Sequence, residues 1–245
     1  MNYAPIQHPL RIEVIALAGT LAKATAIAQE LNIPHVHQYW SEMVVRPDID
    51  LVVVCNVNRD HSAVVRQALR SGKHVIVEYP LAFDYTEAAE LINLAQQQNL
   101  MLHVEHIERP APDKWTYKSD LFGFPLTAAV SRLNRIIVLF GKVKQISCQL
   151  RYDGSLGNSF QSCICNAQLQ FENGMLADVS YAKGENFWQA ERVMELQGSD
   201  GAIIFTGDRG KLITLDGEME LDAGTTRGLF KKDTEIVLEH LLSAG

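Results

Sequence analysis

The first part of the chain alternates between short apolar runs and longer segments that have apolar residues at helical spacing. The apolar runs predict strands at residues 11–19, 51–55, 74–78 and 100–107. The amphipathic segments predict helices at residues 20–31, 60–70 and 86–98, with Thr20 as an N-cap and Gly72 closing the second helix. Strands that alternate with helices in this way predict a parallel, doubly wound sheet.

The pattern changes after residues 109–112, where two prolines stand within three positions. Residues 124–140 again have apolar positions at helical spacing, and beyond Gly141 the pattern is alternating and rich in turn residues. Asn173-Gly174 is a favoured hairpin turn, and further turns are expected at residues 198–201, 208–210 and 216–217. These turns predict an open antiparallel sheet of about five to seven strands. A short helix is expected at residues 234–243.

The predicted fold class is therefore α/β plus α+β, in two domains. Residues 1–109 would form an incomplete, truncated Rossmann-like parallel sheet, and residues 110–245 an antiparallel-sheet domain. A chain of 245 residues that is 47% hydrophobic can bury the core that this organisation needs.

Charge and hydropathy exclude some classes of binding partner. The formal net charge of −7 disfavours nucleic acid, whose phosphates bind basic surfaces. No apolar run reaches the length of about 18 residues that a membrane helix needs. The first ten residues also lack the charged-then-apolar order of a signal peptide. We therefore expect a soluble, cytoplasmic protein that does not bind membranes.

The four cysteines do not suggest a metal site. Cys163 and Cys165 are two apart on a predicted strand and so share a face, while Cys55 and Cys148 stand alone in apolar segments. Zinc sites use closely spaced pairs, and a second pair is missing. We expect reduced and mostly buried thiols, and no bound metal.

The candidate chemistry lies where two predicted parallel strands end. Residues 72–81 read Gly-Lys-His-Val-Ile-Val-Glu-Tyr-Pro-Leu, so an apolar strand runs into Glu78, Tyr79 and a proline that cannot donate a ladder hydrogen bond. The next strand ends at Glu105 and His106. Carboxyl ends of parallel strands open onto the ligand crevice of such sheets, so these residues are candidates for a site. An ordinary strand end with a capped turn is the alternative.

Residues 72–81 resemble the Gly-Lys-His-Val-(Glu)-Lys-Pro motif of the glucose-fructose oxidoreductase/inositol dehydrogenase (Gfo/Idh/MocA) superfamily, with Tyr79 in place of the catalytic lysine. The runs His-Val-Glu-His-Ile-Glu, Trp-Thr-Tyr and Phe-Gly-Phe-Pro-Leu at residues 103–108, 115–117 and 122–126 resemble its cyanobacterial-type biliverdin reductase branch. The resemblance covers nearly the whole chain. It implies three losses: the first strand and helix, a helix and strand between residues 108 and 114, and the end of the C-terminal helix.

The usual dinucleotide site is expected to be absent. That site needs a Gly-x-Gly-x-x-Gly turn between the first strand and helix. Gly19 is the first glycine of the chain, and no second glycine lies near it. By its order in the family fold, the segment 11–31 matches the second strand and helix. The sequence therefore predicts no cofactor-binding residues of the usual kind.

The resemblance also assigns roles to side chains. The proton relay of the sugar dehydrogenases would fall at Tyr79, Ala128 and Arg132, so no group remains to take a proton from a sugar hydroxyl. The same residues suit a bilin, a linear tetrapyrrole with two propionates, because arginine clamps carboxylates and tyrosine offers a stacking surface. The resemblance implies Arg132, Tyr79 and Glu78 as catalytic residues.

Further residues are expected to line the pigment. Arg135 is a candidate propionate partner; the other bilin-binding candidates are Glu105, His106, Trp115 and Lys183. The alternative is that both helix arginines only solvate an exposed face. His103 shares a strand face with Glu105, but a metal site there lacks a third ligand, and a satisfied core histidine is the preferred interpretation.

Three functions follow from these residues. The preferred one is a bilin-binding protein that acts on or carries the pigment without a classical nicotinamide site, as an isomerase or chaperone. The alternatives are an NADPH-dependent biliverdin reductase and a non-catalytic scaffold subunit. A homodimer through the second-domain sheet is expected, because an open sheet with alternating pattern leaves one face to be covered.

Overall fold

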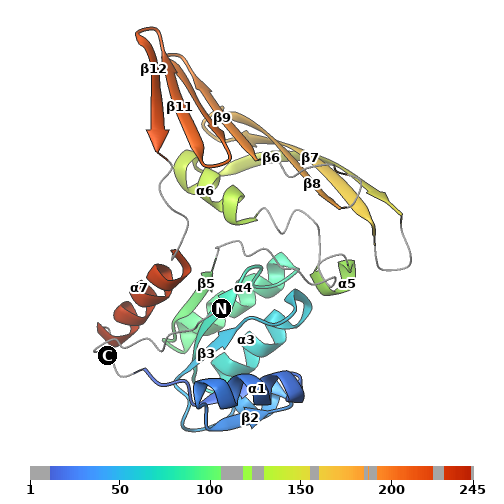
Figure 1. Cartoon of the computed structure of the whole chain (residues 1–245), viewed down its shortest axis with the longest axis vertical. Coiled ribbons are helices and arrows are strands. Elements are labelled where there is room, and N and C mark those ends of the chain that lie inside the picture. Colours follow the sequence, from blue (N-terminus) through green and yellow to red (C-terminus); the bar gives the residue numbers. More distant parts are fainter. Residues whose placement is uncertain are drawn as a thin grey trace.

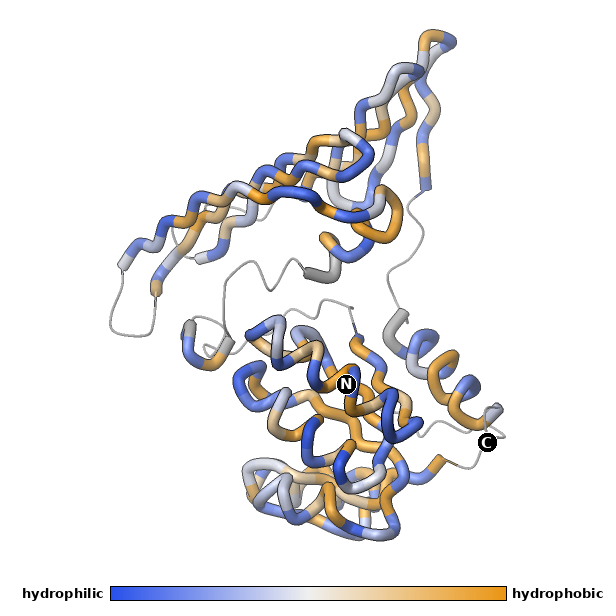
Figure 2. Tube along the Cα trace, turned by 180° about the vertical axis from the view of Figure 1, so that it is seen from behind, coloured by the Kyte–Doolittle hydropathy of each residue, from blue (hydrophilic) through white to orange (hydrophobic). Residues whose placement is uncertain are grey.

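The computed structural model describes residues 12–105, 118–122, 130–154, 160–184, 187, 192–222 and 229–243. A parallel part precedes an antiparallel part, and a last helix returns to the parallel part (Figure 1). Helix α6, Val130–Phe140, lies between the antiparallel strands and the parallel part in both views (Figures 1 and 2).

The parallel part has the predicted alternation of strands and helices. Its strands are β1 Ala16–Ala18, β2 His35–His37, β3 Leu51–Val54, β4 His74–Glu78 and β5 Leu102–Glu105. Its helices are α1 Leu21–Leu31, α2 Trp40–Met43, α3 His61–Arg70 and α4 Tyr85–Gln97, with a 3-10 turn at Asn58–Asp60. All strand pairs are parallel, as predicted. Strand β2 and helix α2 were not predicted, because their sequences are short and largely polar.

The core of the parallel part lies between strands β3 to β5 and helices α3 and α4. Alternate valines of β3 and β4 pack on the apolar sides of the two helices, in a cluster of Val52, Val54, Val75, Val77, Val64, Val65, Ala68, Leu69, Leu91 and Ala95. Figure 2 shows this as the hydrophobic interior of the lower part. Because parallel strands covered by helices bury their faces, these strands carry apolar runs.

The first strand differs from its prediction. Residues 12–15 lie outside any strand, and β1 pairs with β2 over three residues only. In the described part of the chain β1 and β3 are not paired, so the parallel strands form two sheets, β1-β2 and β3-β4-β5. A strand with one short partner has no further hydrogen bonds to extend it, which explains why β1 is shorter than its apolar run.

Two helix ends lie at the predicted residues, Thr20 and Gly72, and a third cap, Asp84, was not predicted. Thr20 stands at the N-cap of α1 but makes no side-chain capping bond. Asp84 caps α4 through bonds from the N–H groups of Thr86 and Glu87 at 2.8 and 3.1 Å. Gly72, at φ 73°, follows α3 and donates its N–H to Leu69, as expected for a glycine that ends a helix.

The antiparallel part contains seven described strands, the upper limit of the prediction. They are β6 Val143–Asp153, β7 Ser162–Phe171, β8 Leu176–Gly184, β9 Val193–Gly198, β10 Gly201–Thr206, β11 Arg209–Thr214 and β12 Gly217–Asp222. They form a three-stranded sheet, β6-β7-β8, and a four-stranded sheet, β12-β11-β10-β9. Hydropathy alternates along these strands (Figure 2), as period-two patterning requires.

Two of the predicted turns can be compared with the structure. At the predicted hairpin, Gly174 has φ 90° and the Asn173 side chain accepts the Met175 N–H at 3.0 Å. The turn predicted at residues 208–210 begins one residue earlier, because Gly210 already lies in β11. Gly210 is the register partner of Phe205, and the Phe205 ring fills the space that a side chain at position 210 would need.

The C-terminal helix α7, Leu229–Ser243, begins earlier than predicted and lies beside β5 (Figure 1). Its Val237 and Leu238 are buried, and its Asp233 binds His103 of β5. None of the described helices is long and apolar enough to cross a membrane. The predicted domain boundary at residues 109–112 lies outside the described residues.

The cysteine prediction is half wrong. Cys163 and Cys165 are buried on one face of β7, but Cys55 and Cys148 are exposed. Cys148 is also not alone, since its sulfur contacts that of Cys165. Cys55 directly follows β3, and β6, which carries Cys148, has one partner strand and is mostly exposed. Apolar neighbours in the sequence therefore do not ensure burial.

Candidate active site

Glu78 and Tyr79 lie at the carboxyl end of β4, beside the end of β5. Glu78 is the register partner of Glu105, so the two residues stand on one face of the sheet. The Tyr79 N–H donates to the Glu105 carbonyl oxygen at 3.0 Å, which extends the pairing beyond β4. Glu105 is 3% exposed, and Glu78 and Tyr79 are half-buried. The structure thus brings the three residues to one edge, and their roles stay predictions.

A buried histidine joins two strand ends at this edge. His61, the first residue of α3, has no exposed surface. Its Nδ1 lies 2.9 Å from the carbonyl oxygen of Pro80, two residues beyond β4, and its Nε2 lies 3.1 Å from that of Asn56, two residues beyond β3. Sequence reasoning missed His61, because a histidine at a helix start gives no sign of contacts with two loops.

The second half of the chain approaches the same edge through α5, Ser119–Phe122. This short helix packs against the 3-10 turn Asn58–Asp60, which follows β3 and leads into His61. Residues of the predicted antiparallel domain therefore border the carboxyl ends of the parallel strands.

His103, Glu105 and Asp233 form a cluster on β5 and α7. One ligand atom of each lies within 4.8 Å of the others. His103 Nε2 is 3.0 Å from Asp233 Oδ2, so the histidine is satisfied by a carboxylate and is only partly buried. Sequence reasoning found no third group near His103 and Glu105. The structure brings in Asp233, which is 130 residues away from His103 in the chain. The ion pair between His103 and Asp233 accounts for the geometry without a metal.

The remaining predicted residues lie farther along the chain. Arg132 and Arg135 are on α6, and Arg135 is exposed. The side chain of Arg132 lies outside what the structure describes, and so do the residues His106 and Trp115. Lys183 is on β8, opposite Cys163, and burial lowers its pKa to about 8. Partial burial also strengthens the attraction between this ammonium group and a carboxylate, because less water screens it.

The described residues do not present a glycine-rich cradle for a pyrophosphate. The turn between β1 and α1 contains one glycine, Gly19, whose N–H already donates to the His37 carbonyl oxygen at 3.1 Å. His37 ends β2 beside this turn, and its Nε2 is buried without a hydrogen-bond partner among the described residues. A ligand at this end of β1 and β2 would find the His37 ring nitrogen beside a turn that has a single glycine.

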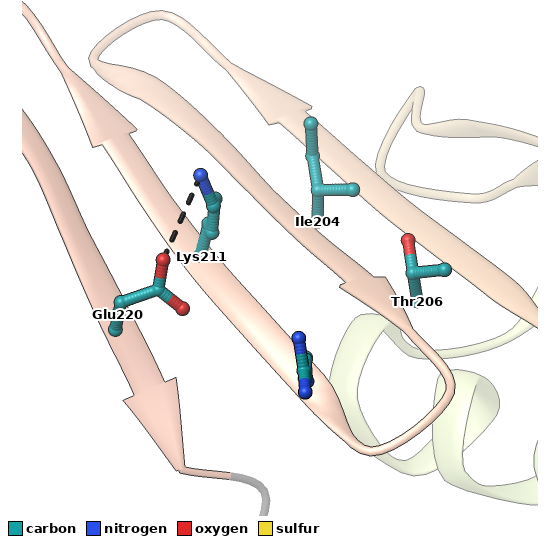
Figure 3. Close-up of a pocket in the computed structure, with 5 residues that line it drawn as sticks. Ile204, Thr206, Lys211 and Glu220 are labelled. Atoms are coloured by element: carbon teal, nitrogen blue, oxygen red, sulfur yellow. Dashed lines mark ion pairs between the residues drawn. The ribbon is translucent and has the colours of Figure 1, made fainter.

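An open hollow of about 430 Å³ lies on the four-stranded sheet β12-β11-β10-β9, which we call the outer sheet (Figure 3). It is lined by one face of β10, β11 and β12, through Ile204, Thr206, Arg209, Lys211 and Glu220. Lys211 lies 3.6 Å from Glu220 and 3.2 Å from Glu218. Because these ion pairs are exposed and shallow, we place the candidate site at the Glu78–Tyr79 edge instead.

Comparisons with known proteins agree with this architecture. Residues 2–106 match the Gfo/Idh/MocA model for an oxidoreductase family with an NAD-binding Rossmann fold. Residues 98–237 match the model for the C-terminal alpha/beta domain of the same family. Biliverdin reductase A of Mus musculus is 27% identical over 235 residues, which cover 86% of this chain and 72% of the mouse protein.

A solved structure is similar over most of its length. The crystal structure of biliverdin reductase from Synechocystis sp. PCC 6803, in complex with biliverdin and NADP+, has a TM-score of 0.85 and 38% identity. The match covers 92% of this chain and 81% of that one. A levoglucosan dehydrogenase in complex with NADH and levoglucosan has a TM-score of 0.71 at 17% identity, which supports the fold alone.

Proposed function

Because the chain belongs to the Gfo/Idh/MocA oxidoreductase family and to its biliverdin reductase branch, we propose that it binds a bilin and acts on or carries it without a nicotinamide cofactor in the usual site. An isomerase or a pigment chaperone would have these properties. The observation that carries the proposal is the Glu78-Tyr79-Pro80 strand end, held against Glu105, in a chain whose first described strand–helix turn has a single glycine.

The proposed roles follow from the chemistry of a bilin. Tyr79 offers a ring and a hydroxyl to the pyrroles, Glu78 a carboxylate to their N–H groups, and Arg132 a proton or a positive charge at the reacting centre. Charged groups suit the propionates, with Arg135 and Lys183 as partners. Glu105, His106 and Trp115 complete the proposed lining. In this scheme none of the steps passes through a nicotinamide.

Two features of the described parallel part support the proposal of an unusual cofactor site. The described strands divide into β1-β2 and β3-β4-β5, with no pairing between β1 and β3 in the described chain. Val53, in the middle of β3, is 54% exposed on the face opposite the α3–α4 core. Strands of a doubly wound sheet are usually covered on both faces, whereas β3 is covered on one face only among the described residues.

Reduction of a bilin by NADPH is the second candidate function. It is favoured by the unpartnered Nε2 of His37 at the end of β2, which could accept or donate one bond to a bound dinucleotide. The Synechocystis relative contains NADP+ beside biliverdin. Under this candidate, hydride chemistry would come from the cofactor, and His37→Ala would weaken NADPH binding.

Absorbance spectroscopy separates the two candidates. Biliverdin is titrated into the purified chain, and NADPH is then added at a concentration well above the micromolar range. Our proposal expects a saturable shift of the bilin band that NADPH leaves unchanged. Consumption of NADPH with loss of the biliverdin band would overturn it in favour of the reductase. A heat-unfolded sample serves as the control and should produce no shift of the bilin band. If the folded chain also produced no shift, both candidate functions would be contradicted.

A further inference from the structure

Three cysteines share one face of the three-stranded sheet. Cys163 and Cys165 lie on the central strand β7, and Cys148 lies on the neighbouring strand β6. Leu150 is the register partner of Cys165, so Cys148 and Cys165 are diagonal neighbours. Their sulfur atoms are 3.3 Å apart. The contact joins two different strands, so local sequence spacing does not impose it.

The two sulfurs differ in access to water. Cys148 is exposed, whereas Cys165 is fully buried. Burial raises the pKa of Cys165, and its contact with Cys148 raises it further, so Cys165 is a thiol at neutral pH. A dissolved oxidant therefore meets Cys148 first, with a protonated thiol already in contact behind it.

We propose that Cys148 and Cys165 form a reversible disulfide when Cys148 is oxidised by a peroxide. In the first step, the Cys148 sulfur attacks one oxygen of hydrogen peroxide; the O–O bond breaks, one water leaves, and Cys148 becomes a sulfenic acid. In the second step, the Cys165 sulfur attacks the Cys148 sulfur; the S–O bond breaks, and the hydroxide leaves as water with the thiol proton. Two thiols thus lose two electrons, and the peroxide becomes two waters.

Closure of the bond requires a small movement within the sheet. A disulfide has an S–S length of about 2.0 Å, so the sulfurs must approach by roughly an ångström. β6 is an edge strand of its sheet in the described chain and is exposed at most positions, while β7 is central. The edge strand is therefore the element that moves. A bond formed by drawing in a strand is readily reduced, which suits a reversible modification.

The other two cysteines provide internal controls. Cys163 lies two residues before Cys165 on β7, opposite Tyr152, and Cys55 follows β3 in the parallel part. Cys55 is exposed like Cys148, and so tests whether exposure alone is enough for oxidation. Cys163 is buried like Cys165 but is not the cysteine whose sulfur contacts Cys148. A change at Cys163 therefore tests whether the contact, rather than burial, selects the partner.

The test is peptide mapping of the full chain. The protein is treated with hydrogen peroxide, free thiols are alkylated, and trypsin is added without reductant. Cleavage after Lys144, Arg151 and Lys183 releases Cys148 in the peptide 145–151, and Cys163 with Cys165 in the peptide 152–183. We expect these two peptides to be linked after peroxide treatment and separated again by dithiothreitol.

Variants identify the partner. The link should persist in Cys163→Ser and in Cys55→Ser, and should be lost in Cys165→Ser. Cys148→Ser, at an exposed position, removes the same link without a change in the core, so the test does not depend on the folding of the Cys165 variant. A link that persists in Cys165→Ser would overturn the proposal. So would a wild-type chain in which Cys148 is over-oxidised or unchanged and no link is found.

Discussion

The ring of His61 lies 2.9 Å from the Pro80 carbonyl oxygen, and so ties the start of α3 to the turn that presents Glu78 and Tyr79. Its other nitrogen lies 3.1 Å from the Asn56 carbonyl oxygen. One fully buried side chain therefore holds the carboxyl ends of two adjacent parallel strands. Replacement of the ring by an apolar one would remove these contacts and leave the partly buried Pro80 carbonyl oxygen without its ring partner.

We predict that His61→Phe destabilises the fold. The ring volume is kept, but the bonds to the two carbonyl oxygens are lost, which costs about 1–3 kcal/mol in the free energy of unfolding. Urea unfolding followed by circular dichroism measures this change. His35→Phe, at an exposed position on β2, is the matched control and should change stability by less than about 0.5 kcal/mol. Equal effects of the two changes would mean that the His61 bonds contribute nothing.

Asp233→Asn should loosen α7 from the parallel part. The carboxylate that binds His103 is lost, and because the pair is partly exposed, the expected cost is about 1 kcal/mol or less. Limited trypsin digestion should cut faster after Lys231 and Lys232, which are exposed on α7. Glu235→Gln removes a pair with Lys231 inside the same helix and should leave the cleavage rate nearly unchanged.

Lys183 should make stability depend on pH. Burial lowers its pKa from 10.5 to about 8 in the folded chain. Between these values the unfolded chain holds a proton that the folded chain has lost, so this group makes the free energy of unfolding rise with pH. Below pH 8 the cost of burying the charge is present in full.

The comparison of Lys183→Met with the unmodified chain isolates this contribution. The variant should be more stable at pH 7 by about 1 kcal/mol, a value reduced for the partial exposure of the site. Its advantage should shrink as the pH rises toward 10.5. Burial raises the pKa of Cys163, and the charge of Lys183 opposes this rise. Loss of Lys183 therefore raises the pKa of Cys163 further, which also makes the advantage of the variant shrink at high pH. An advantage that stays constant with pH would show that Lys183 is not buried in its charged form.

Arg132→Ala should alter bilin binding more than Arg135→Ala or Tyr79→Phe. By resemblance Arg132 falls at the centre of the site, where loss of a desolvated guanidinium costs roughly 2–5 kcal/mol. Arg135 is exposed, and a propionate pair there contributes about 1 kcal/mol or less. Bilin affinity and band position, measured for the three variants, decide the matter. Small and equal effects would place Arg132 on a solvated surface.

We predict that the chain forms a homodimer through the outer sheet. One face of that sheet carries Met194 and Met219, which are 43% and 55% exposed. Met219→Lys should weaken the dimer, because a charge replaces exposed apolar surface on this face. Leu215→Lys, at a fully exposed turn, is the matched control. Light scattering that gives one monomer mass for the unmodified chain over a wide concentration range would contradict the prediction.

Sequence patterns predicted those elements whose apolar period is clear, such as α3, β4 and the Asn173-Gly174 hairpin. β2 was missed because its residues, His-Val-His, have too little apolar contrast. β1 was predicted too long, since strand length depends on hydrogen-bonded neighbours that the period does not reveal.

The site was predictable only in part. Glu78 and Glu105 could be placed together because each ends a strand of the same parallel sheet. The partners of His61 and His103 could not, because the loop carbonyl oxygens and Asp233 are brought in by tertiary packing. Strand alternation placed Cys163 and Cys165 on one face, but the offset that brings Cys148 to Cys165 is a property of the register between strands.

The bond between His103 and Asp233 also sets an order of events during synthesis. A ribosome makes β5 long before α7, and 130 residues separate the two partners. The β3-β4-β5 sheet and its α3–α4 core can form as soon as β5 emerges, whereas the side of β5 that α7 covers waits for nearly the whole chain. During that interval, His103 of β5 lacks the carboxylate partner that Asp233 later provides.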